Sequence, residues 1–106
     1  MELVRLGGCE LKVTPICYGS WQLSPQFWGD QPRDLLIEAM RRALDAGVNF
    51  YDTANAYGDG LSETVMGEAL KTLPREKIIV ATKVFAHFFP DGHRYGDLSK
   101  EFILSE

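Results

Sequence analysis

The feature that most constrains the fold is a regular alternation between short apolar segments and amphipathic segments. The apolar segments cover residues 16–20, 48–52 and 78–84. The two segments between them place apolar residues three and four positions apart, which is helical spacing. The first stripe contains Leu36, Ala39, Met40, Ala43 and Leu44, and the second Val65, Met66, Ala69, Leu70 and Leu73. Apolar strands that alternate with amphipathic helices predict an α/β fold with a parallel sheet.

The ends of the helices carry recognisable signals. Pro32 suits the first residue of the first helix, and Gly47 suits the left-handed position that follows its end. Ser62 is predicted to cap the second helix, which Pro74 stops. A third helix is predicted to begin after Ser99 and to run to the end of the chain. Residues 85–98 are predicted to form a loop.

The first 14 residues predict a β-hairpin in front of this alternation. Short apolar runs lie on both sides of Gly7-Gly8. Two glycines supply the positive φ angles that a tight hairpin turn requires. We therefore expect two antiparallel strands joined by a turn at these glycines.

Composition excludes several classes of function. The net charge is −4, and no basic cluster exceeds Arg41-Arg42, so a nucleic-acid binder is not expected. No apolar run approaches the roughly 20 residues of a membrane span. Cys9 and Cys17 are too few for a disulfide framework and predict reduced thiols in a cytoplasmic protein. His87 and His93 do not have a metal-binding spacing, and no metal is expected.

Polar residues follow the predicted strands where a parallel sheet collects its chemistry. The first strand ends at Gly19-Ser20-Trp21. The second ends at Asp52 with Tyr57 in the next loop, and the third carries Lys83. A phenol is a poor acid at neutral pH, but a nearby ammonium stabilises the phenolate, and a carboxylate keeps that ammonium charged. Such a trio suits proton donation during carbonyl reduction. A surface lysine, a core tyrosine and a loop-capping aspartate remain the alternative.

These residues lie in a familiar order. The stretches 47–54 and 57–63, followed by Gly67, resemble the signature of the aldo-keto reductase family. Residues 81–84 resemble the family's lysine-bearing strand, and Gly19-Ser20-Trp21 resembles its first strand end. The opening hairpin resembles the one that closes the bottom of the family's barrel. The resemblance covers the whole chain in order.

The resemblance implies a (β/α)8 TIM barrel that uses NADPH, or less often NADH, to reduce aldehydes and ketones. Residues 1–106 would be its N-terminal portion, a partial domain with about three of the eight βα units. Tyr57 would be the general acid, Lys83 the partner that stabilises the phenolate of this acid, and Asp52 the carboxylate paired with Lys83. The family's fourth catalytic residue, a histidine, would lie beyond Glu106. We therefore expect the 106-residue chain alone to be inactive.

The resemblance also implies contacts with cofactor and substrate. The residues expected to touch the nicotinamide cofactor are Gly19, Ser20, Trp21 and Asp52. The residues expected to line a pocket for a small carbonyl substrate are Trp21, Trp28 and Phe85. A phosphate-binding loop at Gly58-Asp59-Gly60 is not favoured, because Glu63 replaces the third glycine of a dinucleotide fingerprint. The alternative function is a non-catalytic binding or regulatory subunit on the same fold, similar to a channel β-subunit, although nothing indicates a partner protein.

Overall fold

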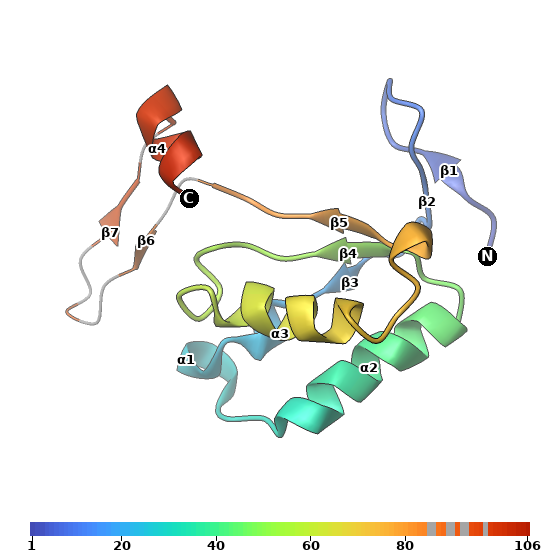
Figure 1. The fold of residues 1–106 in the computed structure, drawn as a ribbon, viewed down its shortest axis with the longest axis horizontal. Coiled ribbons are helices and arrows are strands. Elements are labelled where there is room, and N and C mark those ends of the chain that lie inside the picture. The colour runs from blue at the N-terminus through green and yellow to red at the C-terminus, as the bar shows by residue number, and fades with distance from the viewer. Residues whose placement is uncertain (85–86, 89–90, 92–93, 97) are drawn as a thin grey trace.

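A three-stranded parallel sheet forms the centre of the molecule. The computed structural model describes residues 1–84, 87–88, 91, 94–96 and 98–106. The strands β3 (Tyr18–Gly19), β4 (Phe50–Asp52) and β5 (Ile79–Ala81) lie in that order in the sheet. The helices α2 (Arg33–Asp45) and α3 (Leu61–Leu70) connect them and pack on the same side of the sheet (Figure 1). The predicted βαβαβ order and parallel pairing are confirmed.

The strand register brings the strand ends together. Gly19 pairs with Asp52, and Asp52 pairs with Ala81, so all three strands end at the same edge. The strands are shorter than the apolar runs predicted, because ladder hydrogen bonds form only where partner strands lie opposite one another. Lys83 consequently lies two residues beyond the end of β5 and not within it.

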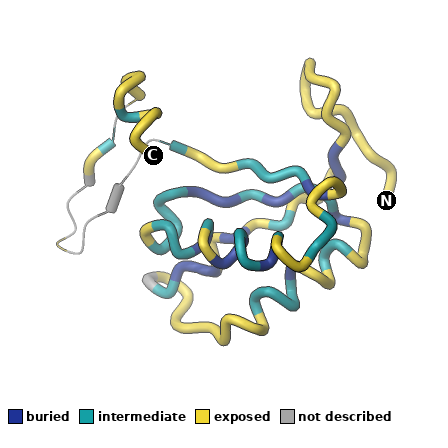
Figure 2. Tube along the Cα trace, viewed as in Figure 1, coloured by how far each residue is buried: buried dark blue, intermediate teal, exposed yellow. Residues whose placement is uncertain are grey.

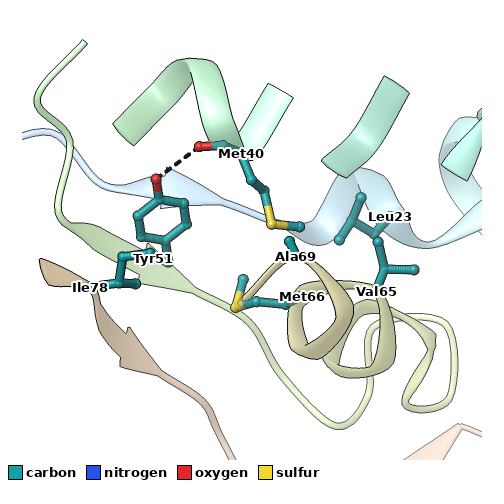
Figure 3. Close-up of a cluster of buried hydrophobic side chains, with 7 residues drawn as sticks. All are labelled: Leu23, Met40, Tyr51, Val65, Met66, Ala69 and Ile78. Carbon is teal, nitrogen blue, oxygen red and sulfur yellow. Dashed lines mark hydrogen bonds between the residues drawn. The ribbon is translucent and has the colours of Figure 1, made fainter. Parts of the chain in front are cut away.

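The main hydrophobic cluster fills the space between the sheet and the two helices (Figure 3). Its members are Leu23, Met40, Tyr51, Val65, Met66, Ala69 and Ile78, each at most 3% exposed. Tyr51 donates a hydrogen bond from its hydroxyl to the Met40 carbonyl at 3.0 Å, so its buried polar atom is paired. Burial, with smaller contributions from Tyr18 and Asp45, raises the pKa of Tyr51 to about 12. Most buried residues lie in the sheet, in α2 and α3 and in the turns next to them (Figure 2).

The Gly47 stop of the first helix is confirmed, whereas three other predicted boundaries are displaced. Pro32 is the residue before the first helix and not its first residue, Ser62 is not a cap, and α3 ends at Leu70, before Leu73 and Pro74. The helix α2 begins at Arg33 directly after Pro32, and Gly47 follows its end with φ +89°. The helix α3 begins at Leu61, because Gly60 takes the left-handed conformation that starts it, with φ +82°. Ser62 is therefore inside the helix and does not cap it. Its hydroxyl turns inward to buried hydroxyl partners instead.

The hairpin pairs β1 (Val4–Arg5) with β2 (Lys12–Val13). Its turn is wider than the tight turn predicted: the Leu6 amide donates to the Leu11 carbonyl across a four-residue loop, and of the two glycines only Gly7 has a positive φ. Asn49, directly before β4, anchors the hairpin. Its side chain accepts a hydrogen bond from the Thr14 amide at 2.7 Å and donates one to the Lys12 carbonyl at 3.0 Å.

Further short elements lie between the predicted strands and helices and within the predicted loop 85–98. The η1 turn (Trp21–Leu23) and α1 (Pro25–Trp28) follow β3, and η2 (Arg75–Lys77) precedes β5. Within 85–98, β6 (His87–Phe88) pairs antiparallel with β7 (Arg94–Tyr95). The helix α4 (Lys100–Ser105) is capped as predicted, with the Phe102 amide donating to the Ser99 hydroxyl. None of the helices in the described part of the chain is long and apolar enough to cross a membrane.

Candidate active site

Lys83 is the centre of a polar cluster at the shared edge of the strands. Its ammonium donates to the Asp52 carboxylate at 2.6 Å, to the Thr53 carbonyl at 2.9 Å and to the Tyr57 hydroxyl at 3.2 Å. The side chain of Lys83 is 49% exposed and that of Asp52 33% exposed. We call Asp52, Tyr57 and Lys83 the trio. The three side chains predicted to meet are thus in direct contact at an accessible edge of the sheet.

The charge state of Lys83 follows from its neighbours. Partial burial alone would lower the pKa of Lys83, because it disfavours the ammonium. Hydrogen bonds and charge interactions with Asp52 and Tyr57 outweigh that effect and raise the pKa of Lys83 above its ordinary value. Lys83 is therefore a stable ammonium at neutral pH, with one proton directed at the phenol oxygen.

The loop after β4 positions Tyr57. The Tyr57 amide donates to the Ala54 carbonyl at 3.1 Å, and its own carbonyl accepts from the Ser62 amide at 3.1 Å. Gly58 next to it has φ +65°, and a Cβ at Gly58 would lie 3.3 Å from the Ser24 Cα. Glycine is required there because the backbone is left-handed and the loop packs closely against Ser24. The loop therefore holds Tyr57 in a defined place beside Lys83.

An aromatic cluster centred on Trp21 lies next to the phenol. The Trp21 ring stacks on the Tyr57 ring with centroids 6.2 Å apart, and it also contacts Phe27 at 5.4 Å and Trp28 at 5.8 Å. Trp21, Phe27 and Trp28 are all exposed. Phe27 was not among the predicted pocket residues, although its position beside Trp28 was a signal that could have included it. Phe85, which was predicted for this pocket, lies outside the described residues.

The predicted cofactor contacts fall into two groups. Gly19 is exposed, with open space where a Cβ would be, and the Trp21 indole is 44% exposed. Ser20 is only 1% exposed, and its hydroxyl donates to the Asp52 carbonyl at 2.7 Å. The Ser20 hydroxyl is therefore engaged inside the protein and not directed to the accessible edge. The pattern Gly-Ser-Trp could not reveal this, because the partners of Ser20 come from distant segments.

The described residues form no group of three or more His, Cys, Asp and Glu side chains that could hold a metal ion. The two cysteines, Cys9 and Cys17, are exposed and free. The polar chemistry at the strand ends thus consists of an ammonium, a carboxylate and a phenol.

The sequence of the chain is similar to those of known proteins. The model of the aldo/keto reductase family matches residues 15–106. The chain is 36% identical over 85 residues to an NADH-specific methylglyoxal reductase of Escherichia coli, covering 78% of this chain and 26% of that protein. It is also 36% identical over 87 residues to a probable voltage-gated potassium channel subunit beta of rice, covering 80% of this chain and 26% of that protein.

Solved structures give the same result for the fold. An aldo-keto reductase from Bacillus halodurans, in its holo form, superimposes with a TM-score of 0.82 at 33% identity. The match covers 99% of this chain and 33% of that chain. The present chain thus spans about a quarter to a third of the length of these relatives, and its fold is that of about three of the eight units of a (β/α)8 barrel. Because the family model matches most of its residues, the chain belongs to the aldo/keto reductase family.

Proposed function

We propose that the protein containing this chain is an oxidoreductase that uses a nicotinamide nucleotide to reduce an aldehyde or ketone to an alcohol. The observation that carries the proposal is the contact between the Lys83 ammonium and both the Asp52 carboxylate and the Tyr57 hydroxyl. Within it, residues 1–106 act as part of a complete barrel that supplies the remaining βα units and a histidine as the fourth catalytic group.

Tyr57 is the proton donor in this mechanism. Its hydroxyl hydrogen-bonds the carbonyl oxygen of the substrate and transfers its proton as negative charge develops on that oxygen. The Lys83 ammonium, 3.2 Å from the Tyr57 oxygen, stabilises the phenolate that remains. Asp52 and the Thr53 carbonyl hold the ammonium in place. The proton is replaced from solvent after the alcohol leaves.

The strand ends fit the nicotinamide end of the cofactor. Open space beside Gly19, the exposed Trp21 indole and the Asp52 carboxylate offer a flat apolar surface next to a polar rim. When bound, the nicotinamide supplies the hydride that adds to the carbonyl carbon. We expect NADPH, and we test NADH beside it because the relative from Escherichia coli is named as NADH-specific. Ser20 supports the site indirectly, through the hydrogen bond that its hydroxyl donates to the Asp52 carbonyl.

The surroundings of Tyr57 favour small carbonyl compounds with an apolar part. Trp21, Phe27 and Trp28 form an exposed aromatic surface next to the phenol. Such a surface binds apolar groups and excludes water from the reacting oxygen. We include Phe85 in this pocket as a proposal from the sequence. We also propose a cytoplasmic location, which the exposed free cysteines support.

The test is carbonyl-dependent oxidation of NADPH and of NADH by the full-length protein, with methylglyoxal and benzaldehyde as substrates. Replacing Tyr57 with Phe removes only the proton donor, and we expect kcat to fall by about 100-fold or more. Lys83→Met is expected to lower kcat by about 10- to 100-fold. Lys71→Met is the matched control, because Lys71 is an exposed lysine directly after the end of α3. Turnover by Tyr57→Phe equal to that of the wild type would contradict the proposal.

The second candidate is a non-catalytic subunit that binds a partner protein. The similarity to the rice channel subunit favours it. It predicts a stable complex with a membrane channel and no carbonyl-dependent turnover with either nucleotide. Substantial turnover that depends on Tyr57 would exclude a purely non-catalytic role.

A further inference from the structure

Three buried hydroxyl groups are hydrogen-bonded to one another next to the trio. Ser20, Thr53 and Ser62 are 1%, 2% and 0% exposed, and we call them the hydroxyl cluster. The Ser62 oxygen lies 2.8 Å from the Ser20 oxygen and 2.9 Å from the Thr53 oxygen. The three residues come from the ends of β3 and β4 and from the first turn of α3. Through these hydrogen bonds, Ser62 connects α3 to the ends of β3 and β4.

The protons of the hydroxyl cluster have one consistent arrangement, because each hydroxyl has a single proton to donate. The Ser20 hydroxyl donates to the Asp52 carbonyl at 2.7 Å. Ser62 must then donate toward Ser20, whose oxygen and carbonyl lie 2.8 and 3.1 Å away. Thr53 in turn donates to Ser62. The hydrogen bonds therefore run in one direction, from Thr53 through Ser62 and Ser20 to the Asp52 carbonyl.

This chain of hydrogen bonds fixes the peptide between Asp52 and Thr53. The Asp52 carbonyl also accepts from the Ser20 amide at 3.0 Å, and the Thr53 amide donates to the Ala81 carbonyl at 2.8 Å. Both residues hold Lys83, Asp52 through its carboxylate and Thr53 through its carbonyl. Movement of this peptide would therefore move the ammonium.

Ser62 also holds the other side of the trio. Its backbone amide donates to the Tyr57 carbonyl at 3.1 Å. One residue consequently links the backbone of the phenol to the peptide that holds the ammonium. The separation between the Lys83 and Tyr57 side chains depends on both links.

We propose that Ser62 is a positioning residue that sets the distance between the Lys83 ammonium and the Tyr57 hydroxyl. The proposal rests on the proposed function for its kinetic consequence, but the geometry it describes does not require turnover. Loss of the Ser62 hydroxyl leaves the Thr53 hydroxyl without its acceptor and the oxygen atoms of Ser20 without their donor. The Asp52–Thr53 peptide then relaxes and the ammonium moves away from the phenol.

The first test is kinetic and uses the full-length protein with methylglyoxal. We expect Ser62→Ala to lower kcat by about tenfold or more while KM changes by less than about twofold, because misplacement by a fraction of an ångström affects the reacting step most. Thr64→Ala is the matched control: it removes an exposed hydroxyl that donates to the carbonyl of Gly60, the residue before α3.

Two further variants guard against a simple folding defect. Thr53→Val removes the terminal donor of the chain at nearly constant volume, leaves the Ser62–Ser20–Asp52 bonds in place and should lower kcat less than Ser62→Ala does. Ser62→Thr keeps a hydroxyl at the centre of the cluster and should recover at least part of the lost kcat. Combining Ser62→Ala with Thr53→Val should cost less than the sum of the single changes, because both break the same chain of hydrogen bonds.

The second test does not depend on reductase activity. Acetylation of Lys83 by a limiting amount of acetic anhydride is measured by mass spectrometry, with the exposed Lys71 as internal reference. We expect the ratio of Lys83 to Lys71 labelling to rise by about three- to tenfold in Ser62→Ala. An ammonium that has moved away from the phenol has a lower pKa, and a fall of one pKa unit gives tenfold more free amine. An unchanged labelling ratio in folded Ser62→Ala overturns the positioning role. The proposed function fails separately, if Tyr57→Phe retains full turnover.

Discussion

The packed unit of the sheet with α2 and α3 differs sharply from the two flanks, the β1–β2 hairpin and α4. Six of the seven residues of the main hydrophobic cluster lie between residues 40 and 78. The hairpin buries Val13 but exposes Leu3, Val4, Leu6 and Leu11, and α4 buries none of its residues. Both flanks are mostly yellow in Figure 2, whereas the dark blue segments lie mainly in the packed unit. Local turn and cap signals therefore form the flanks, whereas burial stabilises the packed unit.

The trio belongs entirely to the packed unit. Asp52 ends β4, Lys83 follows β5, and Tyr57 lies on the loop that leads into α3. Its geometry therefore depends on the core and on the hydroxyl cluster more than on either flank. Geometry alone does not make a complete site, however, and the first prediction separates the two.

The largest expected effect is the loss of activity in the 106-residue chain on its own. Within the described part of the chain, β3 and β5 each pair with a single neighbouring strand, and both flanks expose apolar side chains. Unpaired strand edges and apolar patches favour association between chains. We expect no measurable carbonyl-dependent oxidation of NADPH, together with oligomers in size-exclusion chromatography with light scattering. A monomeric chain with turnover like that of the full-length protein would show that the packed unit is sufficient.

The next effect compares two residues of the same helix. Met40 on α2 is 1% exposed in the main cluster, whereas Leu35 on the same helix is 58% exposed. Met40→Ala is expected to lower the free energy of unfolding of the full-length protein by about 2–4 kcal/mol through lost burial and a cavity. Leu35→Ala should cost about 0.5 kcal/mol or less. Urea unfolding followed by circular dichroism measures both, and equal losses would mean that burial does not separate the two positions.

Much of the packed unit could be predicted because its signals are local or periodic. The apolar stripe of α2 and the Gly47 stop follow from helical spacing and from the freedom of glycine at positive φ. The meeting of Asp52 and Lys83 follows from a general property of parallel sheets, whose strand ends share one edge. These inferences need no knowledge of which distant atoms touch.

The rest depended on distant partners. Ser62 satisfies the rule for a helix cap, but the buried hydroxyls of Ser20 and Thr53 and the left-handed Gly60 decide its place. Ser20 shares a motif with the exposed Trp21, yet its hydroxyl bonds the Asp52 carbonyl 32 positions away. The pairing of β6 with β7 joins segments with no periodic apolar pattern. Tertiary hydrogen bonds of this kind are not encoded in any short window of sequence.

A smaller and local effect tests how the hairpin is joined to the packed unit. Asn49→Ala removes the acceptor of the buried Thr14 amide and the donor to the Lys12 carbonyl. We expect a local loss of about 1–2 kcal/mol, seen as faster hydrogen exchange at the Leu6 and Thr14 amides. The Thr53 amide, which bonds the Ala81 carbonyl, is the internal control and should keep its protection. Equal acceleration of all three amides would mean that Asn49 supports the whole fold and not the hairpin alone.

The smallest effect is the pH dependence of stability contributed by Lys83. Its pKa is raised in the folded protein above the ordinary 10.5, because the hydrogen bonds and charges of Asp52 and Tyr57 outweigh its partial burial. The folded state therefore holds this proton more tightly than the unfolded state does. The stabilisation is fully present below the unfolded pKa and is lost as pH rises through the folded pKa. It is small because half of the Lys83 side chain is exposed to solvent. We expect the difference in urea midpoint between wild type and Lys83→Met to be constant from about pH 7 to 9 and to narrow above about pH 10.5. A difference that widens with pH would mean that the trio does not favour the ammonium, and the trio would then lack the charge that its proposed chemistry requires.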